Sequence, residues 1–158
     1  NVIIGAGTIG QANDLRGFGI YAGSNEGDYA TVQPTIYNNT IIDSEGGIQV
    51  NTSTRSGSIR DNIIAGASTA ATEIQRPSVV TSTNNASGAV SSMGFVDPSA
   101  DNFRLTASSP HKDKGGSSGF PAVDHDGVSR PQFGAADRGA FEHASDDQQP
   151  GPPVLSVQ

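Results

Sequence analysis

The chain has 158 residues, of which 34% are hydrophobic and 20 are glycine, and its formal net charge is −7. It contains no cysteine and only two lysines, Lys112 and Lys114, so a disulfide framework is excluded and a surface that tracks nucleic-acid phosphates is not expected. No apolar run is long enough to span a membrane, and the many small and β-branched residues favour short strands joined by tight turns.

The first strand is predicted at residues 2–4, and the glycines that follow it match a nucleotide-binding pattern. Gly5, Gly7 and Gly10 have the GxGxxG spacing of a dinucleotide-binding loop. That loop requires a helix to open at its third glycine, but Gly17 and Gly19 interrupt the following segment and no alternation of strands and helices continues. We therefore interpret these glycines as tight bends.

A pair of adjacent polar residues then returns every 23 positions. The pairs are Asn38-Asn39, Asp61-Asn62 and Asn84-Asn85. A fixed period of this length is typical of a solenoid, because one coil buries its apolar face only when the next coil stacks on it. We expect Asn39, Asn62 and Asn85 to face inward and to form a ladder of stacked side chains.

The elements of one coil can be assigned from the apolar pattern around these pairs. The expected order is an inserted surface loop over 22–33, strand 35–37, bend 38–39, strand 40–42, turn 43–47, strand 48–50 and loop 55–57. The next coil repeats this order from Ser58, with Ile74 one residue later than the place of Val50 in the coil before. A weaker coil opens at Val79, and strand 2–4 reads as an earlier copy.

The character of the chain changes at Gly94. Five of the six phenylalanines and all three histidines lie beyond this point. We expect residues 1–93 to form the coils and residues 94–143, the closing segment, to cover the end of the stack with large aromatic side chains. Residues 144–158 have the composition of a linker followed by the possible start of another strand. Because the chain begins inside a predicted strand, we expect it to be part of a longer protein.

The closing segment contains several short motifs, among them F-x-D-P, S-P-x-x-D-x-G, D-x-D-G-x-x-R and D-x-G-A-F-E. The residues in these motifs are Phe95, Asp97, Pro98, Asn102, Phe103, Leu105, Ser109, Pro110, Asp113, Gly115, Asp124, Asp126, Gly127, Arg130, Asp137, Gly139, Ala140, Phe141 and Glu142. They resemble the closing segment of secreted bacterial β-helix proteins of the choice-of-anchor type. His111-Lys112 departs from that pattern, which usually has small and apolar residues there.

The coils with an asparagine at one bend resemble the right-handed parallel β-helix superfamily, which includes pectate lyases and alginate lyases. This resemblance implies an all-β fold, a right-handed parallel β-helix of about 23 residues per coil with an irregular C-terminal capping segment. It also implies an extracellular or cell-surface location and an association with polysaccharides. It does not imply catalysis.

The closing segment contains one candidate metal site. Asp124 and Asp126, followed by Gly127, resemble the start of a calcium loop, although the twelfth position holds Ala135 instead of glutamate. Calcium is the only cofactor that the sequence indicates. The favoured alternative is structural, with the carboxylates of Asp124, Asp126, Asp137 and Glu142 paired to Arg130 and Arg138 and capping backbone amides.

Candidate sugar contacts on the coils are Arg55, Arg60 and Arg76. A polysaccharide lyase needs a base and a cation that neutralises the uronate, but residues 1–93 contain no lysine or histidine. His111, His125 and His143 share no catalytic spacing, so catalytic residues stay unassigned and no lyase activity is expected of this chain alone.

The function expected from these features is that of a non-catalytic, carbohydrate-facing scaffold within a larger secreted β-helix protein. One alternative is part of a polysaccharide lyase whose catalytic groove lies mainly upstream. Another is an adhesin or a self-assembling surface filament subunit. The expected partners are the rest of the same protein or another copy, through open coil ends, together with polysaccharide. Nucleic acid and a membrane span are not expected.

Overall fold

The computed structural model describes residues 1–5, 17–23, 32–51, 54–75 and 77–144. Within these residues the chain is all-β, with two short 3₁₀ turns as its only helical elements. The elements in chain order are β1 (Val2–Ile4), β2 (Phe18–Ala22), β3 (Thr35–Tyr37), β4 (Thr40–Ile42), β5 (Gly46–Val50), β6 (Gly57–Arg60), β7 (Ile63–Ala65), β8 (Thr72–Ile74), β9 (Val80–Thr83), β10 (Ala86–Gly88), η1 (Val90–Ser92), β11 (Phe95–Asp97), η2 (Pro98–Ala100) and β12 (Asn102–Leu105).

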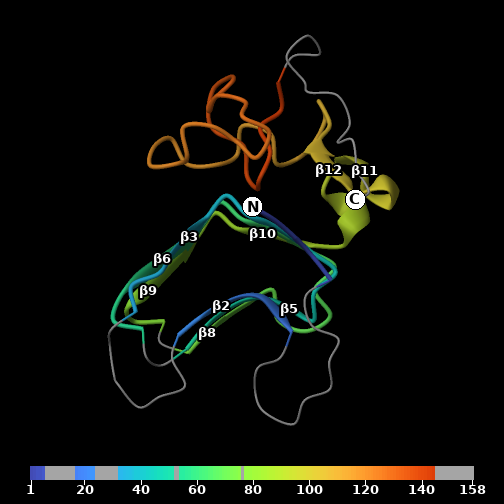
Figure 1. The fold of residues 1–158 in the computed structure, drawn as a ribbon. Coiled ribbons are helices and arrows are strands. Elements are labelled where there is room, and N and C mark those ends of the chain that lie inside the picture. Colours follow the sequence, from blue (N-terminus) through green and yellow to red (C-terminus); the bar gives the residue numbers. More distant parts are fainter. Residues whose placement is uncertain (6–16, 24–31, 52–53, 76, 145–158) are drawn as a thin grey trace, which may run out of the picture.

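Strands β1 to β10 form three parallel sheets. Each turn of the chain around the stack is called a coil here, and each coil adds one strand to a sheet next to the strand from the coil before. The strand orders are β1-β4-β7-β10, β2-β5-β8 and β3-β6-β9. In Figure 1 the stack is seen along its length, so that the strands of one sheet overlie one another. The arrangement is compatible with a β-helix-like solenoid, because copies of one repeat pair in parallel with the copies before and after them.

The hydrogen-bonded register of the strands follows the sequence repeat. Thr40 pairs with Ile63 and Ile63 pairs with Ala86, a shift of 23 residues at each step. Strand β1 pairs with β4, as expected for an earlier copy of the repeat. Val50 pairs with Ile74, so the one-residue delay predicted for this strand is confirmed.

The sheet β2-β5-β8 departs from the sequence prediction at its glycines. The sequence predicts a turn over 43–47, whereas β5 begins at Gly46. A Cβ at Gly46 would lie 2.4 Å from the Phe18 ring, and a Cβ at Gly47 would lie 2.1 Å from the backbone oxygen of Ala71. Both glycines therefore allow neighbouring coils to approach closely within the sheet. Strand β2 is not among the strands that the sequence predicts, although Phe18, Ile20 and Ala22 alternate along it.

An apolar core fills the interior of the stack. Its buried residues are Ile36, Ile41, Ile48, Val50, Ile59, Ile64 and Val80. Register partners in parallel strands project to the same side, so these side chains form rows along the stack. The row through Ile59 ends in Ser82, and the row through Ile64 ends in Ser87. Both serines are exposed, so this end of the stack presents polar side chains to water.

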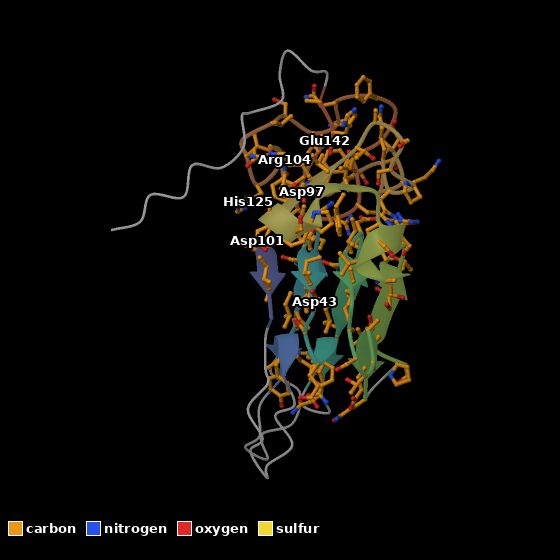
Figure 2. All side chains as sticks on the ribbon, turned by 90° about the vertical axis from the view of Figure 1, so that its right-hand side faces the viewer. Asp43, Asp97, Asp101, Arg104, His125 and Glu142 are labelled. Atoms are coloured by element: carbon orange, nitrogen blue, oxygen red, sulfur yellow. The ribbon has the colours of Figure 1, made fainter. Side chains whose placement is uncertain are left out.

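The closing segment packs against the outer face of the sheet β1-β4-β7-β10. The buried residues of this second core are Ile42, Ile63, Ala65 and Ala86 from the sheet, with Met93, Phe95, Phe103, Leu105, Ala140 and Phe141. In Figure 2 the closing segment lies above the upper row of strands. The prediction that its aromatic side chains cover the end of the stack is therefore wrong. The physical reason is that this sheet is apolar on both faces, whereas the last coil ends in serine.

Candidate functional site

The repeated asparagines form a continuous ladder across the coils. Asn39 Nδ2 donates to Asn62 Oδ1 at 2.9 Å, and Asn62 Nδ2 donates to Asn85 Oδ1 at 2.8 Å. The side chain of Asn1 adds another step, donating to Asn39 Oδ1 at 3.1 Å. The same oxygens of Asn62 and Asn85 accept backbone N–H groups. Since Asn62 is 0% exposed, the ladder satisfies polar groups that water does not reach.

The residue before each ladder asparagine has a left-handed backbone. The φ angle is 51° at Asn38, 58° at Asp61 and 60° at Asn84. Asparagine and aspartate tolerate this region better than most residues, which explains the composition of the repeated pair. Asn38 Nδ2 donates to the carbonyl of Asp137 at 2.9 Å, and Asn84 Nδ2 donates to the carbonyl of Lys114 at 2.7 Å. One residue of the pair thus stabilises the stack, and the other helps to anchor the closing segment.

A buried ionic network holds the closing segment together. Arg130 Nη1 lies 3.2 Å from Glu142 Oε2, and both side chains are 1% exposed. Arg130 also donates to the carbonyls of Asp137 and Gly139 at 3.0 and 2.9 Å. Burial raises the pKa of Glu142 and of Asp137 and lowers the pKa of Arg130, because each charge is removed from water. These contacts stabilise the fold of the closing segment, and the charges involved are not exposed to solvent.

The two aspartates of the candidate calcium loop are engaged by protein groups. Asp124 Oδ1 accepts the N–H groups of Asp126 and Val128, each at 2.8 Å. Its Oδ2 accepts the N–H of Glu142 at 2.8 Å. Asp126 Oδ2 accepts from Arg104 Nε at 2.6 Å. Within the part of the chain that the structure describes, no group of three or more histidine, cysteine, aspartate or glutamate side chains could hold a metal ion.

The ion pairs of this region differ in part from those that the sequence suggests. Glu142 pairs with Arg130 as predicted, whereas Asp126 pairs with Arg104 instead of with Arg130 or Arg138. Arg138 Nη2 donates to Asn84 Oδ1 at 2.6 Å and so contacts the stack. A prediction from the sequence pairs charged residues that are close along the chain. The fold instead brings Arg104 of β12 next to Asp126.

Arg60, a candidate sugar contact, is held in place between the coils and the closing segment. Its Nη1 donates to Asp61 Oδ2 at 2.7 Å, and its Nη2 donates to the carbonyl of Gly119. Its guanidinium lies 5.0 Å from the centroid of the Tyr37 ring. The structure therefore gives Arg60 a structural role. Of the other two candidates, Arg55 is exposed, and Arg76 lies outside the described residues.

A cavity of about 400 Å³ opens between the bend after β3 and the closing segment. Its polar lining residues are Asn1, Thr35, Tyr37, Asn38, Asn39, Asp124, His125 and Arg130, and the side chain of Arg130 is only 1% exposed. Sequence reasoning misses this site, because its two walls come from opposite ends of the chain. The only signal for it is indirect, since the repeated bend and the closing motifs each supply one wall.

Two residues along this cavity carry buried polar atoms with unused hydrogen-bonding capacity. Asn38 Oδ1, an acceptor, and Arg130 Nε, a donor, have no hydrogen-bond partner among the described residues. Leaving such an atom unpaired costs roughly 1–3 kcal/mol. Because both atoms are buried, neither is open to a ligand in the cavity.

A smaller cavity of about 120 Å³ lies on the other side of His125. Phe103 and Phe141 contribute apolar surface to it, and Asp101 and the Arg104 guanidinium contribute charge. Figure 2 labels Asp101, Arg104 and His125 in the closing segment beside the strands. Because His125 lines both cavities, the two form neighbouring parts of one surface.

The three histidines occupy different environments. His111 is buried, and its Nε2 lies 3.1 Å from the sulfur of Met93. His143 Nδ1 lies 3.1 Å from the carbonyl oxygen of Leu105. His125 is exposed at the cavities, where its ring packs edge-on against Phe141. Only His125 of the three lies where it could contact a ligand in these cavities.

Comparisons with known proteins identify no relative. No protein-family model, curated protein or solved structure matches the chain. Across the described ranges, no helix has the length and apolar character needed to cross a membrane.

Proposed function

We propose that this chain is a right-handed parallel β-helix unit of a larger secreted protein, and that it binds carbohydrate without catalysing a reaction. The parallel stacks and the asparagine ladder support the β-helix assignment. The closing-segment motifs support the resemblance to secreted β-helix proteins, because Arg130, Asp137 and Glu142 act together in one buried network. The secreted location rests on that resemblance.

The cavity beside Tyr37 is the observation that carries the binding proposal. Its volume of about 400 Å³ falls in the range of roughly 300–1,000 Å³ that is usual for small-molecule sites. Sugars present hydroxyl groups that both donate and accept, and C–H faces that pack on aromatic rings. Tyr37 and His125 offer rings, and Thr35 and Asp124 offer polar groups. This combination favours a saccharide over a purely apolar ligand.

Binding is favoured over catalysis by the way in which the charged groups of the cavity are used. Asp124 accepts three backbone N–H groups, and Arg130 is paired with Glu142. A general base must be able to take a proton from the substrate, and an electrostatic catalyst must face the charge that develops. Side chains committed to backbone groups and to each other orient the site instead.

The proposal is tested by screening the purified chain against an oligosaccharide array and measuring the best ligand by calorimetry. Replacing Tyr37 with alanine should weaken binding by roughly tenfold, about 1.4 kcal/mol. Tyr37→Phe should retain most of the affinity, because it keeps the ring. Phe133, an aromatic residue of the closing segment that is 50% exposed, supplies the matched control Phe133→Ala.

The expected result is a ligand whose affinity falls in Tyr37→Ala and His125→Ala and is unchanged in Phe133→Ala. Thermal unfolding of each variant shows whether the fold is retained. Absence of binding to every oligosaccharide, or an equal loss in Phe133→Ala, contradicts the proposal. Formation of an unsaturated sugar product would show that the site is catalytic.

A further inference from the structure

The two arginines that line the cavities are each paired with a carboxylate. Arg130 of the larger cavity lies 3.2 Å from Glu142, and Arg104 of the smaller cavity lies 2.6 Å from Asp126. A guanidinium paired in this way attracts a second anion weakly, because the two opposite charges largely cancel beyond their contact. Neither arginine is thus available to neutralise a carboxylate on a ligand.

Carboxylates outnumber cationic side chains around these cavities. Asp124 lines the larger cavity, Asp101 and Asp126 line the smaller one, and Glu142 is paired with Arg130 without lining either. Asp124 is satisfied by backbone amides that carry no net charge. The nearby cation Arg60 is paired with Asp61. An anionic ligand would therefore meet net negative charge, on a chain whose overall charge is −7.

The carboxylate of Asp124, which lines the larger cavity, favours the same kind of ligand. A hydroxyl group can donate a hydrogen bond to a carboxylate oxygen, whereas an ionised carboxylate has no proton to donate. Bringing a carboxylate to Asp124 would also place two acceptors together, which is costly in a partly desolvated site.

We infer that this site selects an uncharged saccharide, recognised through its hydroxyl groups, and discriminates against sugars that carry a uronic acid carboxylate. The inference rests on the proposed function, because it names the class of sugar that the same cavity accepts. It separates this site from the uronate-binding groove that a pectate- or alginate-acting protein would need.

The test compares neutral and anionic oligosaccharides at pH 8, where histidine side chains are generally neutral. The probes are xylo-, cello- and manno-oligosaccharides, alginate oligosaccharides, and oligogalacturonides with and without methyl esterification. The esterified and unesterified oligogalacturonides differ in the charge of the carboxyl group and in the methyl group of the ester. The tightest ligand should be neutral, and methyl esterification should raise galacturonide affinity at least several-fold.

A gain of uronate binding is expected when a cation is added at the cavity. Val123 lines the larger cavity and is 48% exposed, so Val123→Lys adds charge without disturbing the core. It should raise the affinity for alginate oligosaccharides roughly fivefold or more at low salt, and added salt should reduce the gain. Val96→Lys is the matched control, because Val96 is 50% exposed and is not among the lining residues of either cavity.

Each outcome decides between the two proposals. If a uronate is the tightest ligand of the unmodified chain, the inference is wrong while the binding function stands. If no saccharide of either kind binds, the proposed function fails and the inference fails with it. Equal gains in Val123→Lys and Val96→Lys would show that the added charge acts through the whole surface, which overturns the assignment to this cavity.

Discussion

Each bend of the stack contains two adjacent residues with different structural roles. The first residue adopts a left-handed backbone, as Asn38, Asp61 and Asn84 do, and the second extends an amide to the coils on both sides. An amide suits the second position, because it carries an acceptor and two donors in one group. The repeated dipeptide is therefore explained by backbone geometry together with hydrogen-bond satisfaction.

The ladder leads to a prediction about Asn62. Its side chain is fully buried, accepts from Asn39 and donates to Asn85 and to the carbonyls of Ile36 and Arg60. The substitution Asn62→Ala should lower the free energy of unfolding by roughly 1–3 kcal/mol, because buried partners are left unpaired. Urea denaturation monitored by circular dichroism measures this loss.

Thr83→Ala, at an exposed position of β9, is the control for Asn62→Ala and should change stability by less than about 0.5 kcal/mol. If Asn62→Ala has an equally small effect, the ladder does not stabilise the stack.

At the scale of elements, the closing segment depends on close contact with the sheet β1-β4-β7-β10. Ala140 N–H donates to Thr40 Oγ1 at 2.9 Å, and the neighbouring Gly139 has φ of +86°. A Cβ at Gly139 would lie 2.7 Å from Thr40 Oγ1 and 2.8 Å from Ile63 Cδ1. Glycine is needed here both for its backbone conformation and for the space that it leaves.

These two requirements can be separated by comparing Gly139→Ala with Gly127→Ala. Both glycines have φ of +86°, but a Cβ at Gly127 would meet nothing within 4 Å. Backbone strain should therefore be similar in both variants, and Gly139→Ala should lose a further 1–3 kcal/mol, roughly, from overpacking. Thermal unfolding at equal concentration measures the difference. Equal losses would mean that the closing segment is not packed tightly on this sheet.

At the scale of the whole molecule, the stack and the closing segment share one sheet between two cores. Strands β4 and β7 are buried along their whole length, because one face packs inside the stack and the other packs on the closing segment. The last coil differs, since its interior rows end in Ser82 and Ser87. Polar residues in a terminal repeat keep the open end of a stack soluble.

The polar end predicts how the molecule responds to an apolar substitution there. Ser87→Ile, combined with Ser82→Ile, would continue the isoleucine rows to an open strand edge, which is a template for association. Sedimentation velocity should show concentration-dependent association of this double variant beyond that of the unmodified chain. Ser58→Ile is the control, because Ser58 pairs with Thr81 on the outer face of β6. Association of both variants to the same extent would refute a specific role for the polar end.

The sequence by itself determined the stack. The 23-residue repeat predicts which strands pair, and it places Asn39, Asn62 and Asn85 at equivalent bends. The prediction is possible because every coil needs the same local structure, so a bend residue and its apolar neighbours recur at a fixed spacing. The repeat predicts neither the role of Gly46 in β5 nor the strand β2, because their packing depends on contacts with neighbouring coils.

Only the tertiary structure decided where the closing segment lies and what it creates there. Its motifs show that it is a unit, but not that it covers the side of the stack, that Arg104 pairs with Asp126, or that Arg60 binds the Gly119 carbonyl. The cavity between Tyr37 and His125 arises from that docking. Contacts between segments this far apart depend on complementary shape and burial, and a linear pattern carries no information about either.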